Sequence, residues 1–204
     1  MATWVAAIGT ISAVVVALLQ VARERKLRLD RERSERSEKH RAHAELIAAW
    51  VGPPQAVPHN TETPSYHTTS NSDADYRTPI YIHNGSLEPI YEIVVGIVFV
   101  QGAAPHNLEK MLDVFTERSP RGPLPATTSA IIPPGTWCLW LRGKGWTGVM
   151  GGRGGADIAF VDRGGVSWVR RAMGTLEELD QRPLAHFAQH RLYGPYEFQL
   201  PKQM

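Results

Sequence analysis

The feature that most constrains this chain is an uncharged stretch that leads directly into a dense run of charges. Residues 2–22 contain no Asp, Glu, Lys or Arg. As a helix, these 21 residues would span about 30 Å, the thickness of the hydrocarbon core of a bilayer. Trp4, near the start, is suited to the interface between lipid and water. The stretch therefore predicts a transmembrane anchor.

A cleaved signal peptide is the alternative, and it would need basic residues before a shorter apolar stretch. Here the basic residues Arg23, Arg25, Lys26 and Arg28 come after the stretch instead. Positively charged flanks stay on the cytoplasmic side of a membrane. We therefore expect a single-pass protein of the cytoplasmic membrane, with its N-terminus outside and its C-terminal domain in the cytoplasm. The same four side chains are candidates for contact with lipid headgroups.

The remaining charge is unevenly distributed. Residues 1–51 carry nine Lys or Arg and six Asp or Glu, whereas residues 52–204 carry thirteen and fourteen, a net charge of −1. This balance argues against nucleic acid as a partner. The single cysteine, Cys138, excludes an intramolecular disulfide and a zinc site built from cysteines, and a free thiol suits a reducing compartment.

Residues 23–52 predict a charged juxtamembrane helix, about 45 Å long at most. Acidic and basic residues recur four positions apart, as in Glu24–Arg28 and Glu32–Arg36, and such pairs stabilise a helix. Large apolar residues are too few for a coiled-coil seam. We expect the helix to continue through the apolar residues 44–51 and to end at Pro53.

Beyond a polar linker or edge segment at residues 53–76, the pattern predicts a mainly β domain at residues 77–204. Strand signals lie at residues 77–83, 89–100, 127–132, 137–141, 156–161 and 166–171. Turn signals, the first of them at Asn84–Gly85, suggest that consecutive segments form three hairpins. Short helices are expected at residues 107–118, with Asn107 as N-cap, and at residues 183–191. Strand pairs without alternating long helices favour an antiparallel β-sandwich.

Several phrases of the sequence carry a resemblance: "IHNGSLEPIYEIVV", "IIPPGTWCLWLRGKGWTG", "IAFVDRGGVSWVRR" and "HFAQHRLYGPYEFQLP". With the anchor and the charged helix before them, they resemble a family of actinobacterial, streptomycete-type membrane-anchored proteins. The resemblance covers nearly the whole chain. It implies a membrane tether and an immunoglobulin- or fibronectin-like sandwich, and it implies no particular reaction, ligand or catalytic residue.

A glycine-rich segment at residues 143–155 is the strongest candidate for a contact loop. It contains a GxGxxG match at residues 143–148, but more glycines follow where a dinucleotide site needs a helix. The loop could instead hold an anion through its cations and amides, or contact a partner through its indole. The candidate contact residues are Gly143, Lys144, Trp146 and Arg153.

The other polar motifs do not predict catalysis. His186 and His190 lie one helical turn apart, but the glutamate and the third ligand of a zinc site are missing. Asp157 and Asp162 flank an apolar strand, and Asp162 fits turn chemistry better than acid–base chemistry. Ser167 lies in a strand and not on a nucleophile elbow.

Together these observations predict a membrane-tethered, cytoplasm-facing interaction module that is not an enzyme and has no cofactor or metal. Its expected partners are the membrane and a protein, not nucleic acid. Two alternatives stay open: a binder of small anionic ligands, or an enzyme, that uses residues 143–155, and a structural membrane component that forms homo-oligomers.

Overall fold

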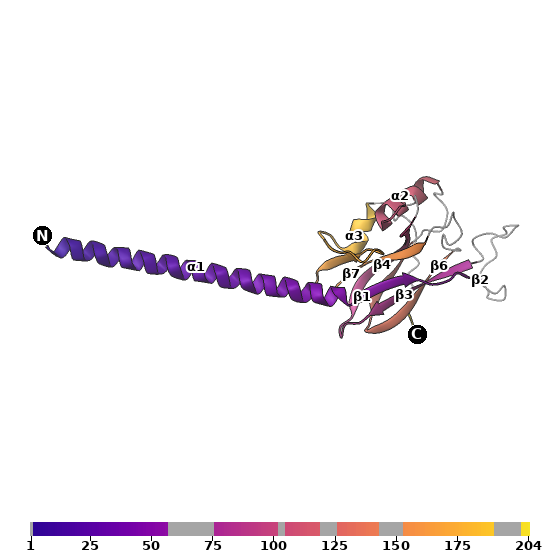
Figure 1. Ribbon diagram of the computed structural model, residues 1–204, viewed down its shortest axis with the longest axis horizontal. Coiled ribbons are helices and arrows are strands. Elements are labelled where there is room, and N and C mark those ends of the chain that lie inside the picture. The colour runs from indigo at the N-terminus through magenta and orange to yellow at the C-terminus, as the bar shows by residue number, and fades with distance from the viewer. Residues whose placement is uncertain (1, 57–75, 102–104, 119–125, 143–152, 190–200) are drawn as a thin grey trace. The chain divides into compact units, whose positions relative to one another are not determined.

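The computed structural model of the protein describes residues 2–56, 76–101, 105–118, 126–142, 153–189 and 201–204 (Figure 1). For residues 2–19, 22, 56, 76, 115–118 and 142 the description covers the backbone alone. The chain divides into two compact units, residues 1–42 and residues 43–204, and each is described by itself.

A single helix, α1, runs from Ala2 to Glu45. From residue 23 to residue 39 its side chains are exposed, and Arg36 Nη2 lies 3.9 Å from Glu32 Oε2 one turn away. A helix that is polar on all sides depends on such pairs because it has no apolar face to pack. The predicted charged helix is therefore confirmed as far as Glu45.

The predicted anchor, residues 2–22, coincides with the first part of α1, but most of its side chains lie outside the described residues. Among the residues that are described, no helix is both long and apolar enough to cross a membrane. The anchor therefore remains a prediction.

The prediction that the helix continues to residue 52 is wrong. Residues Ile47–Val51 form strand β1, which pairs with strand β3, Tyr76–Asn84. A turn at Leu46, whose N–H donates to the carbonyl of His43, separates helix from strand. In the strand, Ile47, Ala49 and Val51 alternate onto one face and join the core, which a helix could not achieve with this spacing.

The second unit contains two antiparallel sheets (Figure 1). Sheet A has the order β1–β3–β6–β10, and β2 also pairs with β3; the further strands are β2 Gln55–Ala56, β6 Gly135–Arg142 and β10 Lys202–Gln203. Sheet B has the order β5–β4–β7–β8–β9, with β4 Ile90–Phe99, β5 Ala126–Ile132, β7 Gly154–Val161, β8 Ser167–Arg170 and β9 Leu176–Leu179. The mainly β prediction is confirmed, and β2, β9 and β10 were not predicted.

One of the three predicted hairpins is correct. Strands β7 and β8 pair across the turn at Asp162, where the Asp162 carboxylate accepts from Val166 N at 2.9 Å and Gly165 adopts a φ of +84°. Strands β3 and β4 do not pair with each other, and neither do β5 and β6, because each of these pairs is divided between sheet A and sheet B. Strand β5 pairs with β4, β6 pairs with β3, and the Pro133–Pro134 connection crosses from sheet B to sheet A.

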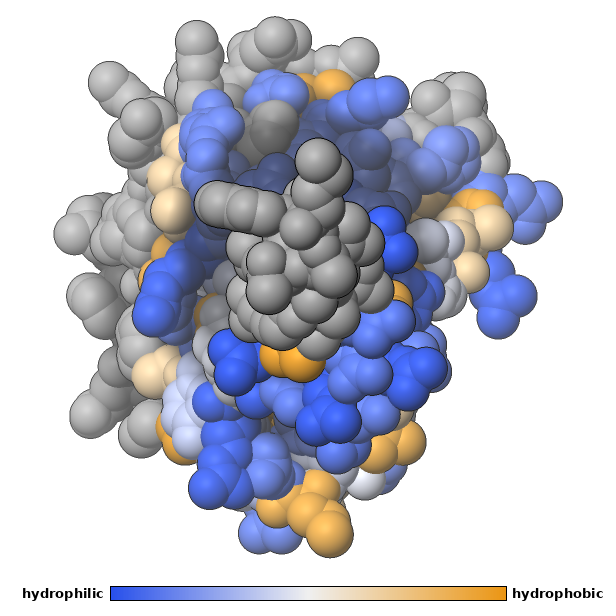
Figure 2. Space-filling model, turned by 90° about the vertical axis from the view of Figure 1, so that its left-hand side faces the viewer, coloured by the Kyte–Doolittle hydropathy of each residue, from blue (hydrophilic) through white to orange (hydrophobic). Residues whose placement is uncertain are grey.

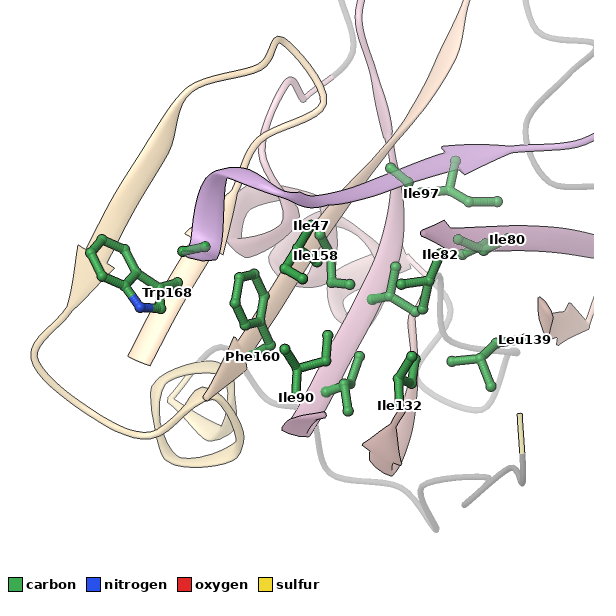
Figure 3. Packing of buried hydrophobic residues seen from close by; sticks show 14 of the residues in the cluster. Ile47, Ile80, Ile82, Ile90, Ile97, Ile132, Leu139, Ile158, Phe160 and Trp168 are labelled. Carbon is green, nitrogen blue, oxygen red and sulfur yellow. The ribbon is translucent and has the colours of Figure 1, made fainter. Parts of the chain in front are cut away.

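Residues from both sheets share one hydrophobic core (Figure 3). Sheet A contributes Ile80, Ile82 and Leu139, and sheet B contributes Ile158 and Phe160 among others. All five side chains are fully buried. Complete burial of a side chain of this size stabilises the folded state by about 1.5–3 kcal/mol. The packing between the two sheets is therefore the main source of stability.

The opposite face of sheet B carries a second, smaller core. Helices α2, Leu108–Arg118, and α3, Pro183–Ala188, cover it, with Leu108, Leu112 and Phe187 packed on Val94 and Ala159. Sheet B is therefore buried on both faces, which explains the nearly continuous apolar run of β4. The predicted cap of α2 is confirmed, because Asn107 Oδ1 accepts from Lys110 N at 3.0 Å.

The amide of Asn84, at the end of β3, joins three segments. Its Nδ2 donates to the carbonyls of Glu88 at 2.8 Å and Ile132 at 3.2 Å. Its Oδ1 accepts from the backbone N–H of Ser86 at 3.1 Å and from the Ser86 hydroxyl at 2.6 Å. Both donors and both acceptor sites are used, so Asn84 fixes the crossing between the sheets.

We expect Asn84→Ala to lower the free energy of unfolding by about 2–3 kcal/mol, because it removes the donor to the buried Ile132 carbonyl and the acceptor of the Ser86 N–H, while the Ser86 hydroxyl keeps its bond to Glu88. Urea denaturation of the full chain measures the loss. Thr175→Ala, at an exposed position, is the control and should change stability by less than about 0.5 kcal/mol. Equal losses in the two variants would contradict the assigned role.

Candidate functional site

The main concentration of charge in the described domain surrounds Arg171, directly after β8. Three carboxylates meet it there, each from a different element: Glu109 of α2, Asp157 of β7 and Glu177 of β9. His186 of α3 joins them through Glu109. We call these five residues the Arg171 cluster. It lies on the side of sheet B that α2 and α3 cover, because Asp157 and Val169 alternate with the core-facing residues of their strands.

The guanidinium of Arg171 donates hydrogen bonds to three carboxylates. Nη1 donates to both oxygens of Glu109, at 2.9 and 2.7 Å, and to Asp157 Oδ2 at 3.2 Å. Nη2 and Nε donate to Glu177 Oε2 at 3.0 and 3.3 Å. Such charge-assisted bonds are the strongest hydrogen bonds in proteins, and here they connect a helix with two strands.

Asp157 is the most deeply placed member, with no exposed surface. Its Oδ2 accepts from the backbone N–H of Leu108 at 3.0 Å, and its Oδ1 accepts from the N–H of Ala172 at 2.8 Å. The first bond satisfies one of the free N–H groups at the start of α2, where a negative charge is also favoured by the helix dipole. Asp157 therefore holds α2 and the residues after β8 in place.

The pKa values of the two acids move in opposite directions. Burial raises the pKa of Asp157, and the N–H donors of Ala172, Arg171 and Leu108 only partly offset it. Burial also acts to raise the pKa of Glu109, but hydrogen bonds from Arg171 and His186, with the charge of Arg171, bring it below its ordinary value. Burial disfavours the charge of Arg171, yet its acidic partners raise its pKa.

The geometry favours a structural role for this cluster over a catalytic one. Its one pair of acid–base type is His186 Nε2 with Glu109 Oε1, 3.1 Å apart, and Glu109 is already bound by Arg171. A catalytic acid or base needs free access to a substrate, whereas these groups satisfy one another. Among the described residues, no group of three or more His, Cys, Asp or Glu side chains is arranged to hold a metal.

Most of the predicted contact loop falls outside the described residues, including Gly143, Lys144 and Trp146. Arg153 is described: its side chain is exposed, and its carbonyl accepts from the N–H of Val100 at 2.9 Å. The candidate lipid-contacting residues Arg23, Arg25, Lys26 and Arg28 are exposed on α1.

The remaining predicted positions have ordinary structural environments. Cys138 is buried, and this burial raises the pKa of its thiol, which disfavours the reactive thiolate. Ser167 is buried in β8. Asp162 accepts from Trp168 Nε1 at 3.1 Å as well as from the turn, which confirms its turn role. His190, the expected companion of His186, lies outside the described residues.

Comparison with known proteins adds no family: no family model, no curated protein and no solved structure matches the chain. The resemblance to actinobacterial membrane-anchored proteins therefore stays a prediction, and the function has to be argued from the geometry.

We expect Arg171→Met to lower the free energy of unfolding by about 3–5 kcal/mol, because it leaves the charges of Glu109 and Asp157 buried without a cation. Arg163→Met is the matched control: Arg163 pairs with Glu88 at 2.6 Å but is largely exposed, so its loss should cost about 1 kcal/mol or less. Urea denaturation at neutral pH compares the two, and similar losses would refute the buried character of the cluster.

The pKa of Glu109 predicts a loss of stability in acid. Since its pKa is lower in the folded than in the unfolded chain, ionised Glu109 stabilises the fold above its ordinary pKa, and this contribution disappears as the pH falls through the lowered value. The raised pKa of Asp157 acts with the opposite sign. Glu109→Gln removes the Glu109 contribution and retains that of Asp157. The variant should therefore have a lower free energy of unfolding at neutral pH, and this free energy should decline less steeply than in the natural sequence between about pH 6 and about pH 3. Unfolding curves of both proteins across this range measure the difference, and parallel declines would contradict it.

Proposed function

We propose that this protein is a single-pass membrane protein that presents its two-sheet domain in the cytoplasm as an interaction module. One observation carries the proposal: α1 is continuous from the predicted anchor to Glu45, and its last turn belongs to the domain unit. A tether of this kind needs both a continuous helix and a firm attachment at its end.

The attachment is made by backbone carbonyls at the end of α1. Arg170 Nη2 donates to the carbonyl of Glu45 at 2.8 Å and to that of Ala44 at 3.4 Å. A cation at a helix C-terminus satisfies free carbonyls and complements the helix dipole. The N–H of Gly85 donates to the carbonyl of Leu46 at 3.1 Å. The last residues of α1 and the turn before β1 are thereby bonded to the end of β8 and to the residue after β3, so the end of the helix is part of the domain.

The rest of α1 suits a spacer. Residues 23–45 would give a reach of about 34 Å, and their mixed charges keep the helix solvated.

Figure 2 shows a face of the molecule dominated by hydrophilic residues, with hydrophobic ones in small separate areas among the coloured atoms. An interaction module rather than an enzyme fits the described side chains, because their main polar cluster satisfies itself.

For the fold, we propose a β-sandwich of immunoglobulin or fibronectin type. The support is a core shared by two antiparallel sheets, and connections that cross between the sheets from β3 to β4 and from β5 to β6. Crossings of this kind are typical of sandwiches with Greek-key connections.

The proposal is tested with the full-length chain in bacterial cells. We expect the protein to resist alkaline extraction from membranes, and a C-terminal reporter to be active only in the cytoplasm. Removal of residues 2–22 should release the protein into the soluble fraction. A soluble full-length protein, or a C-terminus outside the cell, would refute the tether.

The interaction role is tested by crosslinking in the same cells. A specific protein should be captured repeatedly, and the capture should be lost in Trp146→Ala or in the Lys144→Ala, Arg153→Ala double variant if the predicted loop is the contact surface. Lys110→Ala, at an exposed site on α2, is the control. Crosslinks between copies alone would favour the structural oligomer instead.

A further inference from the structure

We propose that the outer face of sheet A is a docking surface for an anionic lipid bilayer. This face consists of the side chains that alternate away from the core. Their positions follow from the register of the strands, which pairs Trp50 with Tyr81, Tyr81 with Cys138, and Cys138 with Lys202 in one row. Leu46, Arg77, His83 and Met204 also belong to this face, whereas Cys138 is buried within it.

The register is secured by the core residues between these positions. Ile80, Ile82 and Leu139 point into the core, so Arg77, Tyr81 and His83 lie on the opposite side of β3. Two backbone hydrogen bonds extend the register beyond the strand ends: Gly85 N donates to Leu46 O at 3.1 Å, and Met204 N donates to Thr136 O at 3.2 Å. Leu46 and Met204 therefore belong to the same face.

Large apolar side chains on this face are open to solvent. Leu46 is 51% exposed, Trp50 is 44% exposed and Met204 is 70% exposed. The rings of Trp50 and Tyr81 lie 5.7 Å apart at 31°, so the indole is held against a neighbour and not free to fold away. Exposed apolar side chains gathered on one face mark a contact surface more often than isolated ones do.

The charge of the face is of one sign. The strands of sheet A contain three basic residues, Arg77, Arg142 and Lys202, and no Asp or Glu. The strands of sheet B contain four acidic residues and one basic residue, Arg170. The net charge of −1 for the domain hides this difference between its two sheets. Arg77 and Lys202 are both exposed, so their cations are available to an anionic partner.

This combination favours a bilayer over single-stranded nucleic acid. Trp and Tyr are suited to the lipid interface, and exposed Arg and Lys are attracted to anionic headgroups. Leu46 and Met204 can enter the acyl boundary but offer no ring for a base to stack on. The tilted contact with Tyr81 also occupies part of the Trp50 ring that a base would use.

The inference rests on the proposed membrane tether. A domain joined to the bilayer by residues 23–45 stays within about 34 Å of the lipid surface, so a weakly binding face is enough to dock it when this helix lies along the surface and not upright on it. Docking and anchoring are nevertheless separate events, since anchoring depends on residues 2–22 and docking depends on sheet A and on the charge of the lipid.

The experiment uses the full-length chain with Cys138→Ala and one new cysteine for an environment-sensitive fluorophore. Met204→Cys places the probe on sheet A, and Ile131→Cys, also at an exposed apolar position, places it on sheet B as control. The protein is reconstituted into vesicles of phosphatidylcholine alone or of phosphatidylcholine with about one third phosphatidylglycerol. Brominated lipid should quench the probe at position 204 only in the anionic vesicles, and should leave the probe at position 131 unchanged.

Charge reversal separates docking from nonspecific contact. Each basic residue near an anionic surface contributes about fivefold to binding, so Arg77→Glu with Lys202→Glu should lower the docking equilibrium at least about 25-fold. Lys110→Glu with Arg163→Glu makes the same change of net charge at exposed sites elsewhere and should have little effect. Equal quenching at positions 204 and 131, or no difference between the two lipid compositions, would overturn the proposal.

Two further outcomes are distinguishable. If an oligothymidylate, and not the vesicles, changes the probe at position 204, the face binds nucleic acid and the membrane proposal is wrong. If the protein fails to float with phosphatidylcholine vesicles, the anchor is wrong. Docking then stands only if anionic vesicles alone carry the protein and the Arg77→Glu, Lys202→Glu variant abolishes this.

Discussion

The burial of sheet B on both faces is the constraint on which the rest of the structure depends. One of its inner strands, β4, presents apolar side chains to sheet A on one side and to α2 and α3 on the other. Neither layer alone could cover both faces, so the domain requires three layers. The outward-facing side of sheet A is thereby left with a different composition, aromatic and basic, because it is not needed to cover sheet B.

The covering of sheet B also explains the charges at its edge. Two neighbouring arginines stand at the end of β8, Arg170 as its last residue and Arg171 directly after it, and their side chains lie on opposite sides of the sheet. Arg170 reaches the carbonyls at the end of α1, and Arg171 binds the carboxylates that hold α2 in place. Because successive residues of a strand point to opposite faces, one short segment connects the helix end with the outer helices. The edge of sheet B is therefore the place where the helices of the protein are attached.

The sequence predicted the elements of the fold better than their pairing. The strands at β3, β4, β7 and β8, and the capped helix α2, follow from local periodicity and turn chemistry, which depend on near neighbours in the chain. The hairpin predicted for β5 and β6 was wrong because a Pro-Pro turn between two strands is compatible with pairing and with crossing to another sheet. The helix predicted through residues 44–51 was wrong because Ile47–Val51 gains more from alternating burial beside β3 than from one more helical turn.

For the candidate site, the sequence determined that an uncharged stretch of 21 residues precedes a helix of mixed charge, that one cysteine is present, and that the domain has almost no net charge. Asp157, inside an apolar strand, was a signal that a buried partner must exist, but its partners lie far away in the sequence, on α2 and after β8. Only the tertiary structure decided that Arg171 binds Glu109, Asp157 and Glu177, that His186 contacts Glu109, and that the basic and acidic strands separate into different sheets. The physical reason is that charge pairing and sheet membership depend on contacts across long separations in the chain, whereas helix and strand propensities are set by neighbouring residues.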